Sequence, residues 1–263
     1  MAKKPVVVVG MGEMGSVFAR AFLKQGHPVY PVNRHTNMKK LARKLPQPRT
    51  VVVAVGENDL QSVLKTIPAD WRKRLTLLQN ELLPDDYREL GKVTVISVWF
   101  EKKKGQDSKV IIPSPAQGPR TKLLQKALST LDIPVRVVEK QREMLFELVL
   151  KNLYILTSNI AGLRVGGTVG ELWRDHPEFA RKVANDVIRL QEALTGSRFN
   201  NDELVSAMVT AFDGDPAHKC MGRSAPARLE RALAHADRLG IELPTLREIA
   251  DEQSAGDNTA APL

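Results

Sequence analysis

The sequence contains a single cysteine, few aromatic residues and no long hydrophobic run. Cys220 alone cannot build a disulfide framework or a cysteine-based zinc site. No apolar run approaches the roughly 20 residues needed to cross a bilayer. The apolar stretch Val6–Val9 is too short, and begins too early, to belong to a signal peptide. We therefore expect a soluble, cytoplasmic protein without a membrane partner.

The composition is otherwise that of a globular protein, with an excess of positive charge. The 263 residues include 43% hydrophobic and 26% charged residues, which excludes a disordered, collagen-like or coiled-coil chain. Residues 1–139 carry 24 Lys and Arg against 12 Asp and Glu, whereas residues 140–263 carry 15 against 18. With aromatic residues at 5% and no recognised motif, nucleic-acid binding is the minor interpretation of this charge. That interpretation predicts binding that weakens steeply with salt.

Short β-branched runs alternate with helical patterns in residues 1–139, which indicates a parallel sheet with crossover helices. The predicted strands are residues 5–9, 29–32, 50–55, 75–78, 93–98 and 134–138, and the predicted helices are 14–25, 36–45, 59–67 and 121–131. Thr36 is the expected cap of the second helix. Residues 99–104 and 109–112 read as a hairpin across Gly105.

Residues from 141 onward carry almost no strand signal. The apolar periodicity predicts helices at residues 144–160, 179–194, 204–212 and 227–239. The expected fold class is α/β, with a Rossmann-type, doubly wound parallel sheet over residues 1–139 followed by an all-α domain over residues 140–250. Residues 251–263 are small and polar, and we expect them to form a disordered tail.

The segment Gly10-Met11-Gly12-Glu13-Met14-Gly15 fits the pattern G-x-G-x-x-G between a buried strand and a helix. The first glycine allows the tight turn, the second admits a pyrophosphate close to the backbone, and the third allows close helix–strand packing. The N–H groups and dipole of the following helix favour an anion there. The pattern predicts dinucleotide binding rather than a structural glycine turn.

The end of the second strand indicates which dinucleotide binds. An NAD site usually has Asp or Glu there to bind the ribose 2′-OH. Here the strand ends at Val32 and is followed by Asn33 and Arg34, without a carboxylate. Because an arginine matches a 2′-phosphate in charge and geometry, we expect NADP(H) rather than NAD(H).

Lys151 lies in the middle of an otherwise apolar helix. Burying an ammonium is costly unless it is paired or close to solvent. One interpretation is therefore structural, in which Glu147 pairs with it from one turn earlier or its amine reaches water. The other is functional, in which Lys151 is a cationic acid facing a cleft, with Ser158 and Asn159 presented to a small anionic substrate.

These residues resemble the ketopantoate reductase (2-dehydropantoate 2-reductase) family over about residues 5–248. The matching segments are the glycine pattern, Lys24–Val29 with Asn33-Arg34, Gln79-Asn80, Glu147-Leu148 with Lys151 and Asn159, Gly170-Glu171-Leu172, and Leu239–Pro244. The resemblance implies NADPH-dependent reduction of a small 2-oxo acid in the pathway to pantothenate. It implies that Lys151 is the general acid, that Asn80 lies beside cofactor and substrate, and that Asn159 holds the substrate.

The sequence departs from the family pattern on the substrate side. Asparagines of the pattern are replaced by Ile155 and Val169, and Glu81 stands where the pattern has glycine. An ungapped alignment places the substrate-orienting glutamate of the family at Ser224. Ser224 is therefore a substrate-binding candidate, in a half of the chain that has changed more than the cofactor half.

Other candidates are weaker, and two functions stay open. Arg223 or Arg164 is a candidate for binding a substrate carboxylate, although a surface role is favoured for both. His176, His218 and His235 lack metal-ligand spacing, so we expect surface histidines and no metal. The chain is either a 2-oxo-acid reductase or a non-catalytic NADP(H)-binding regulatory protein, and a homodimer is left open.

Overall fold

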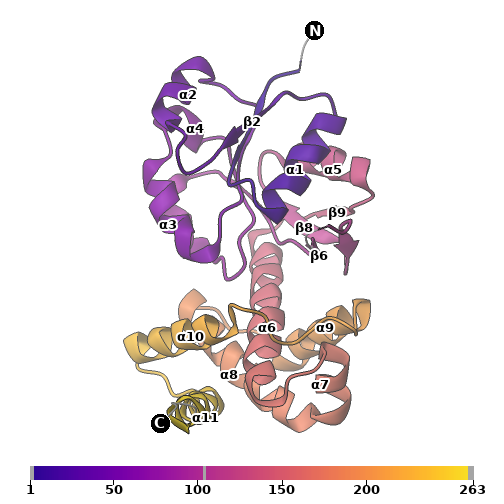
Figure 1. The fold of residues 1–263 in the computed structure, drawn as a ribbon, viewed down its shortest axis with the longest axis vertical. Helices are drawn as coiled ribbons and strands as arrows, with labels where there is room; N and C mark the ends of the chain where they lie inside the picture. Colours follow the sequence, from indigo (N-terminus) through magenta and orange to yellow (C-terminus); the bar gives the residue numbers. More distant parts are fainter. Residues whose placement is uncertain (1–2, 103–104, 260–263) are drawn as a thin grey trace. The chain divides into compact units, whose positions relative to one another are not determined.

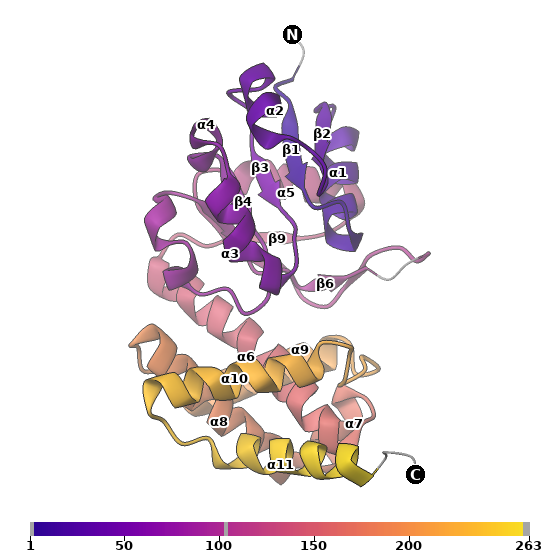
Figure 2. The same cartoon turned by 60° about the vertical axis from the view of Figure 1, so that its left-hand side comes forward.

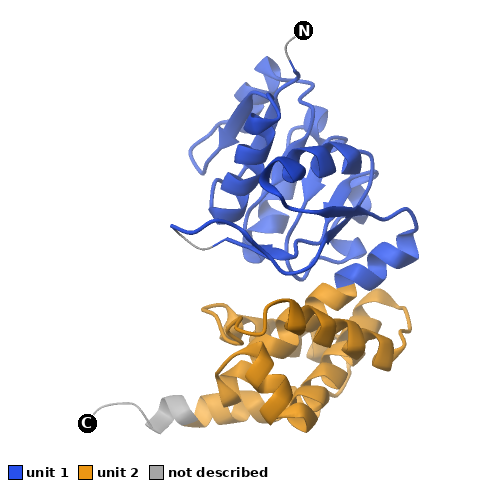
Figure 3. Cartoon of the chain, turned by 90° about the vertical axis from the view of Figure 1, so that its right-hand side faces the viewer, with its two compact units in different colours: residues 1–148 blue, residues 149–263 orange. Residues whose placement is uncertain are grey.

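A computed structural model describes residues 3–102 and 105–259, and the chain forms two compact units, residues 1–148 and 149–263 (Figure 3). The sequence placed the domain boundary at residue 139, just before helix α6 (Gln141–Val165). The division by packing falls inside this helix because Met144 and Leu148 belong to the core of the first unit. Each unit is described separately below.

The first unit is built on a seven-stranded sheet in the order β2-β1-β3-β4-β5-β8-β9. The strands are β1 (Val6–Val9), β2 (Val29–Val32), β3 (Val51–Val53), β4 (Leu75–Leu77), β5 (Thr94–Ile96), β8 (Ser114–Gln117) and β9 (Val135–Val137). Neighbours from β2 to β5 are parallel, β8 is antiparallel to β5, and β9 is parallel to β8. The predicted doubly wound sheet is confirmed, and it is mostly rather than entirely parallel because β8 runs antiparallel to β5.

Helices cover both faces of this sheet (Figure 1). Those of the first unit are α1 (Glu13–Lys24), α2 (Met38–Lys44), α3 (Glu57–Thr66), α4 (Ala69–Arg72), α5 (Thr121–Leu128) and the start of α6, with short 3-10 turns at Pro84–Asp86, Arg88–Leu90 and Ser129–Leu131. Val6 and Val8 pack in the core with α1 and α5, whereas Val7 and Val9 pack in the core that includes α3 and α4. Burial on both faces explains why β1 is a continuous valine run.

The hairpin is also found, as antiparallel β6 (Phe100–Glu101) and β7 (Lys109–Val110). It is shorter than predicted, and Lys103 and Lys104 of the expected first strand lie outside the described residues. The sequence missed β8 because Ser114-Pro115-Ala116-Gln117 has no β-branched residue. Burial by the neighbouring strands, rather than intrinsic preference, forms this strand.

The second unit is helical, as predicted (Figure 2). After α6 it contains α7 (Val169–Asp175), α8 (Pro177–Thr195), α9 (Asn201–Gly214), α10 (Ala225–Leu239) and α11 (Pro244–Thr259). The predicted disordered tail is wrong for residues 251–259, which form the end of α11. Residues 260–263 of that tail lie outside the described residues.

Helix α11 is attached by Asp186 of α8. The carboxylate of Asp186 accepts hydrogen bonds from the backbone N–H of Thr245 and Leu246, at 2.8 and 3.2 Å. These are N–H groups of the first turn, which have no partner within a helix. No helix in the described part of the chain is both long and apolar enough to cross a membrane.

Candidate functional site

The glycine turn between β1 and α1 has a backbone that other residues would distort. Gly10 has a φ of +88°, and a Cβ there would lie 2.7 Å from the carbonyl oxygen of Ala54. A Cβ on Gly15 would lie 1.9 Å from the carbonyl oxygen of Gly10. The first and third glycines therefore fulfil the roles predicted for them, a tight turn and close packing of the helix on the strand.

Gly12 differs from both, because a Cβ on it would meet nothing within 4 Å. It is the N-cap of α1 and provides no side-chain cap, so the first N–H groups of the helix have no side-chain partner from this residue. The helix N-terminus thus opens onto space with its positive end exposed, which is the arrangement that binds phosphate groups.

A cleft of about 770 Å³ lies beside this turn, at the carboxyl ends of β1, β2 and β3. It brings together five of the predicted cofactor residues, namely Gly10, Met11, Gly12, Asn33 and Arg34. The lining does not include Glu13, Met14, Gly15 or Asn80. The sequence analysis missed the polar residues that also line it, which are Thr36, Asn37, Lys39, Asp59, Ser62 and Thr66.

The turn after β2 fixes the position of Arg34. The backbone N–H of Asn33 donates to Oγ1 of Thr36 at 3.0 Å, and the N–H of Thr36 donates to the carbonyl of Asn33 at 2.9 Å. Thr36 is therefore not the cap of α2. That role belongs to Asn37, whose side chain accepts from the N–H of Lys40 at 2.9 Å.

Asn80 follows β4 in the same unit. Its Nδ2 donates to Oε1 of Glu57 at 3.1 Å, at the first turn of α3. The preceding Gln79 is buried, and its side chain donates to the carbonyls of Val53 and Val55 at 2.7 and 3.2 Å. These bonds to the end of β3 fix the direction in which the chain leaves β4.

One of the two interpretations of Lys151 pairs its ammonium with Glu147, but Glu147 has another partner. Its carboxylate pairs with Arg136 of β9, which also binds Glu143 at 2.7 Å. Glu147 therefore does not support the structural interpretation in which it neutralises Lys151 from one turn earlier. In the sequence, Glu147 and Lys151 are candidates for pairing only because they are four residues apart on one helix. In the fold, Arg136 of β9 takes the carboxylate of Glu147 instead.

Lys151 is half-buried in α6. Its Nζ lies 5.4 Å from the centre of the Tyr154 ring, within range of a cation–π interaction. Burial lowers the pKa of Lys151 to about 7, and the positive charge of Arg228 contributes to this shift. An ammonium with a pKa near neutrality both donates and regains a proton readily.

Asn159 and Ser158 are placed differently from each other. The side chain of Asn159 donates to the carbonyl oxygen of Cys220 at 2.9 Å and accepts from Nη1 of Arg228 at 2.6 Å. Ser158 is fully buried, and its hydroxyl donates to the carbonyl of Tyr154 at 2.8 Å within the same helix. The structure thus shows Asn159 in contact with Arg228, a residue that the sequence analysis missed.

The remaining candidates of the second unit lie at its surface. Ser224 is an exposed residue before α10, and its side chain makes no cap of that helix. Arg223 is also exposed. Arg164 is partly exposed and binds Glu248 and Glu252 of α11 at 3.0 and 2.6 Å.

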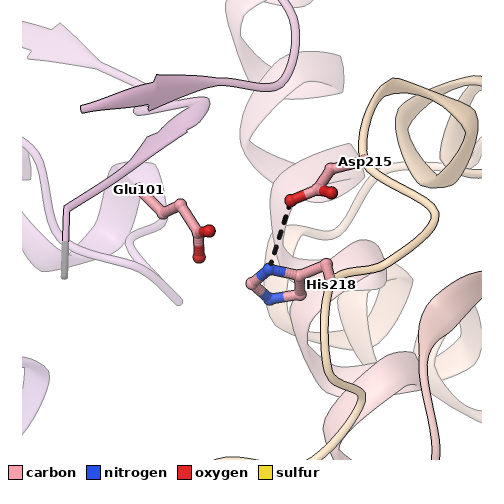
Figure 4. Close-up of side chains that lie close together, drawn as sticks. All are labelled: Glu101, Asp215 and His218. Carbon is pink, nitrogen blue, oxygen red and sulfur yellow. Dashed lines mark ion pairs between the residues drawn. The ribbon is translucent and has the colours of Figure 1, made fainter. Parts of the chain in front are cut away.

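His218 is not the surface histidine that the sequence suggested. Its Nδ1 lies 3.9 Å from Oδ2 of the buried Asp215 (Figure 4). Its ring centre lies 6.2 Å from that of Tyr154, which also contacts Phe212 at 5.2 Å. Tyr154 therefore lies in contact with both Lys151 and His218, and His218 belongs to the loop after α9.

Comparison with known proteins agrees with this architecture. Residues 5–83 match a family model described as the NAD binding domain of 6-phosphogluconate dehydrogenase. No curated protein sequence matches the chain.

Solved structures match it over almost its whole length. A 2-dehydropantoate 2-reductase from Methylococcus capsulatus has a TM-score of 0.70 at 14% identity, covering 98% of this chain and 99% of that one. A dimeric ketopantoate reductase from Staphylococcus aureus has a TM-score of 0.64 at 17% identity, covering 98% and 100%. D-mandelate dehydrogenase in complex with NADH has a TM-score of 0.65 at 12% identity, covering 98% and 100%. The chain therefore has the fold found in ketopantoate reductases, and its first 80 or so residues match an NAD-binding domain.

Proposed function

We propose that this protein is an NADPH-dependent reductase of a small 2-oxo acid and a divergent member of the ketopantoate reductase family. The first unit binds the dinucleotide and the second supplies the proton donor. The observation that carries the proposal is Lys151, an ammonium in an apolar helix whose pKa is lowered to about 7 by burial. The shared fold supports the assignment.

The cleft of the first unit fits the dinucleotide in two places. The open space at Gly12 and the N-terminus of α1 suit the pyrophosphate, whose charge the helix dipole favours. Arg34 and Lys39 line the same cleft and would hold a 2′-phosphate. Asp59 also lines the cleft, and its carboxylate suits a ribose hydroxyl rather than a phosphate.

The reaction needs a hydride and a proton. The nicotinamide that the first unit would hold would supply the hydride for the carbonyl carbon of the substrate. Lys151 donates its proton to the carbonyl oxygen as negative charge develops there, and regains a proton from water. General acid catalysis of this kind contributes about 10²–10⁴-fold to the rate. Near neutral pH the lowered pKa leaves Lys151 partly protonated and a stronger acid than an ordinary lysine.

The substrate candidates have unequal support. Asn80, at the carboxyl end of β4, and Asn159, beside Arg228, remain proposed substrate-side groups. The buried hydroxyl of Ser158, already bonded to a carbonyl, and the exposed Ser224 are weaker candidates. The exact 2-oxo acid, ketopantoate or a related compound, is a matter for assay.

A non-catalytic NADP(H)-binding protein is the second candidate function. It is favoured by Ile155 and Val169, which are buried apolar residues where the family pattern has asparagine. Such a protein would bind the dinucleotide with the first unit and turn over no 2-oxo acid.

The test measures NADPH oxidation by absorbance with a panel of 2-oxo acids that includes ketopantoate. Wild-type protein is compared with Lys151→Ala and Lys151→Met, and NADPH binding is measured by calorimetry for each. We expect turnover in the wild type and a loss of about 10²-fold or more in both variants, with NADPH binding unchanged. Turnover that survives in the variants would overturn the role of Lys151. Tight NADPH binding without any turnover would favour the second candidate.

Light scattering of the same samples determines whether the protein is a homodimer.

A further inference from the structure

Arg228 is a half-buried cationic residue of the second unit, and a hydrogen bond to Asn159 holds its side chain in place. It lies in the first turns of α10, and its Nη1 donates to Oδ1 of Asn159 at 2.6 Å. Asn159 lies 69 residues earlier, in α6, so this contact joins two helices that meet only in the folded chain.

The amide of Asn159 is oriented by its second bond. Its Nδ2 donates to the backbone carbonyl of Cys220 at 2.9 Å, and a carbonyl can only accept. The amide oxygen must therefore face Arg228. Both ends of the amide are hydrogen-bonded within the protein. Its oxygen accepts from a charged guanidinium, and hydrogen bonds to charged groups are the stronger ones.

Arg228 is bonded to Asn159, which lies about two turns after Lys151 on the same helix. Its positive charge also contributes to the lowered pKa of Lys151. Placing two cations together costs electrostatic energy, which an anion bound between them offsets. In a 2-oxo acid, the carbonyl oxygen and the carboxylate sit on adjacent carbon atoms. A proton donor to the carbonyl oxygen and a cation that binds the carboxylate must therefore lie next to each other.

We propose that Arg228 binds the carboxylate of the substrate while Asn159 acts as its positioning residue. This inference rests on the proposed reductase function and assigns the residue that recognises the carboxylate of its 2-oxo acid. The substrate carries a carboxylate directly beside the reducible carbonyl. A guanidinium pairs with a carboxylate through two parallel hydrogen bonds, so it selects the acid over its neutral ester. Asn159 acts on the substrate through Arg228 rather than by touching it.

The experiment compares each 2-oxo acid that is turned over with its methyl ester. Variants are Arg228→Met, Arg228→Lys, Asn159→Ala and the control Arg238→Gln, which removes a positive charge from an exposed position of the same helix. Thermal melting of each variant verifies folding. For Arg228→Met we expect the KM for the acid to rise by about tenfold to a hundredfold, with a change of less than threefold for the ester.

The other variants separate binding from positioning. Arg228→Lys restores part of the affinity because charge remains while the fork geometry is lost. Asn159→Ala raises the KM for the acid by a smaller factor, and Arg238→Gln leaves it unchanged. If the acid and the ester respond equally to Arg228→Met, or neither responds, the assignment is overturned.

Oxalate binding distinguishes failure of this inference from failure of the proposed function. Calorimetry with oxalate, in the presence of NADP⁺, measures carboxylate recognition without turnover. If the wild type reduces no 2-oxo acid but binds oxalate, and Arg228→Met abolishes that binding, the proposed function fails while the carboxylate site stands. Turnover by the wild type with oxalate binding unaffected by Arg228→Met overturns the inference and leaves the function intact. If the wild type neither turns over a 2-oxo acid nor binds oxalate, both are overturned.

Discussion

Glu147 precedes Lys151 by one turn of α6, and its carboxylate binds Arg136 of β9 instead. Arg136 also binds Glu143, so one guanidinium accounts for both acidic residues at the start of the helix. The nearest acidic residue along α6 therefore forms its ion pair with β9. Burial of the Lys151 ammonium is the main cause of its lowered pKa, and the positive charge of Arg228 contributes.

The lowered pKa makes stability depend on pH in a defined direction. Lys151 has a pKa of about 7 when folded and 10.5 as a free side chain, so the unfolded chain binds more protons between these values. The free energy of unfolding therefore rises with pH across this window, and the burial cost is complete below about pH 7.

Lys151→Met should accordingly stabilise the protein most at low pH. Between about pH 6 and about pH 9 its advantage over the wild type should shrink by up to about 3 kcal/mol, because each pKa unit corresponds to about 1.4 kcal/mol. Urea unfolding of both proteins at the two pH values measures this, and contributions common to both cancel in the difference. An advantage that is constant or grows with pH contradicts the lowered pKa.

Two glycines of the phosphate turn should separate folding from cofactor binding. Gly12→Ala adds a methyl group to open space at a φ of −72°, so its effect on the free energy of unfolding should stay within about 1 kcal/mol. That methyl group occupies the proposed pyrophosphate position, so NADPH affinity should fall by about tenfold or more. Calorimetry and thermal melting measure the two effects.

Gly10→Ala is the matched variant. It combines a φ of +88° with a Cβ 2.7 Å from a backbone oxygen, so it should lower the free energy of unfolding by about 1–3 kcal/mol. Unimpaired NADPH binding by a well-folded Gly12→Ala protein would contradict the proposed cofactor site.

Arg34 should determine the preference for NADPH over NADH. Arg34→Gln removes the charge that pairs with a 2′-phosphate, and we expect NADPH affinity to fall by about tenfold or more. The affinity for NADH should change little because NADH lacks the 2′-phosphate. Lys40→Gln is the control, since Lys40 carries the same charge on α2 but does not line the cleft. An unchanged ratio of the two affinities in Arg34→Gln would refute the assignment of the coenzyme.

The predictable part of the fold is the part that local patterns encode. The valine runs of β1 and β3 pack on both faces, so their hydrophobicity directly reports their burial. Strand β8 has no such pattern, because its place between β5 and β9 is set by partners far along the chain. Helix α11 was missed because its attachment depends on Asp186, 59 residues before Thr245.

The candidate site divides in the same way. Gly10, Met11, Gly12, Asn33 and Arg34 line one cleft because a single β-α-β segment carries them. On the substrate side, the decisive contact joins Asn159 to Arg228, and the hydrogen bond to Cys220 depends on the course of a loop. No periodicity in the sequence reports either contact, so the sequence named Arg223 and Arg164, whereas the residue that we propose, Arg228, emerges only from its hydrogen bond to Asn159.

Gly162→Ala should disturb that loop. In an isolated helix this substitution stabilises by about 1 kcal/mol, but here a Cβ would lie 2.8 Å from Cβ of Cys220 and 3.0 Å from the backbone nitrogen of Met221. We expect a net loss of about 1–3 kcal/mol in the free energy of unfolding.

Cys220 is the only cysteine of the chain, so its thiol reports directly on this contact. Burial raises the pKa of the Cys220 thiol to about 12, and it should react slowly with a thiol reagent in the native wild type. Displacement of the loop by Gly162→Ala should accelerate that reaction, because the thiol becomes accessible. Gly222→Ala is the control, since a Cβ there meets nothing within 4 Å. If Gly162→Ala matches this control in both stability and thiol reactivity, the loop does not pack against α6 at Gly162, and the hydrogen bond from Asn159 to the carbonyl of Cys220 loses its support.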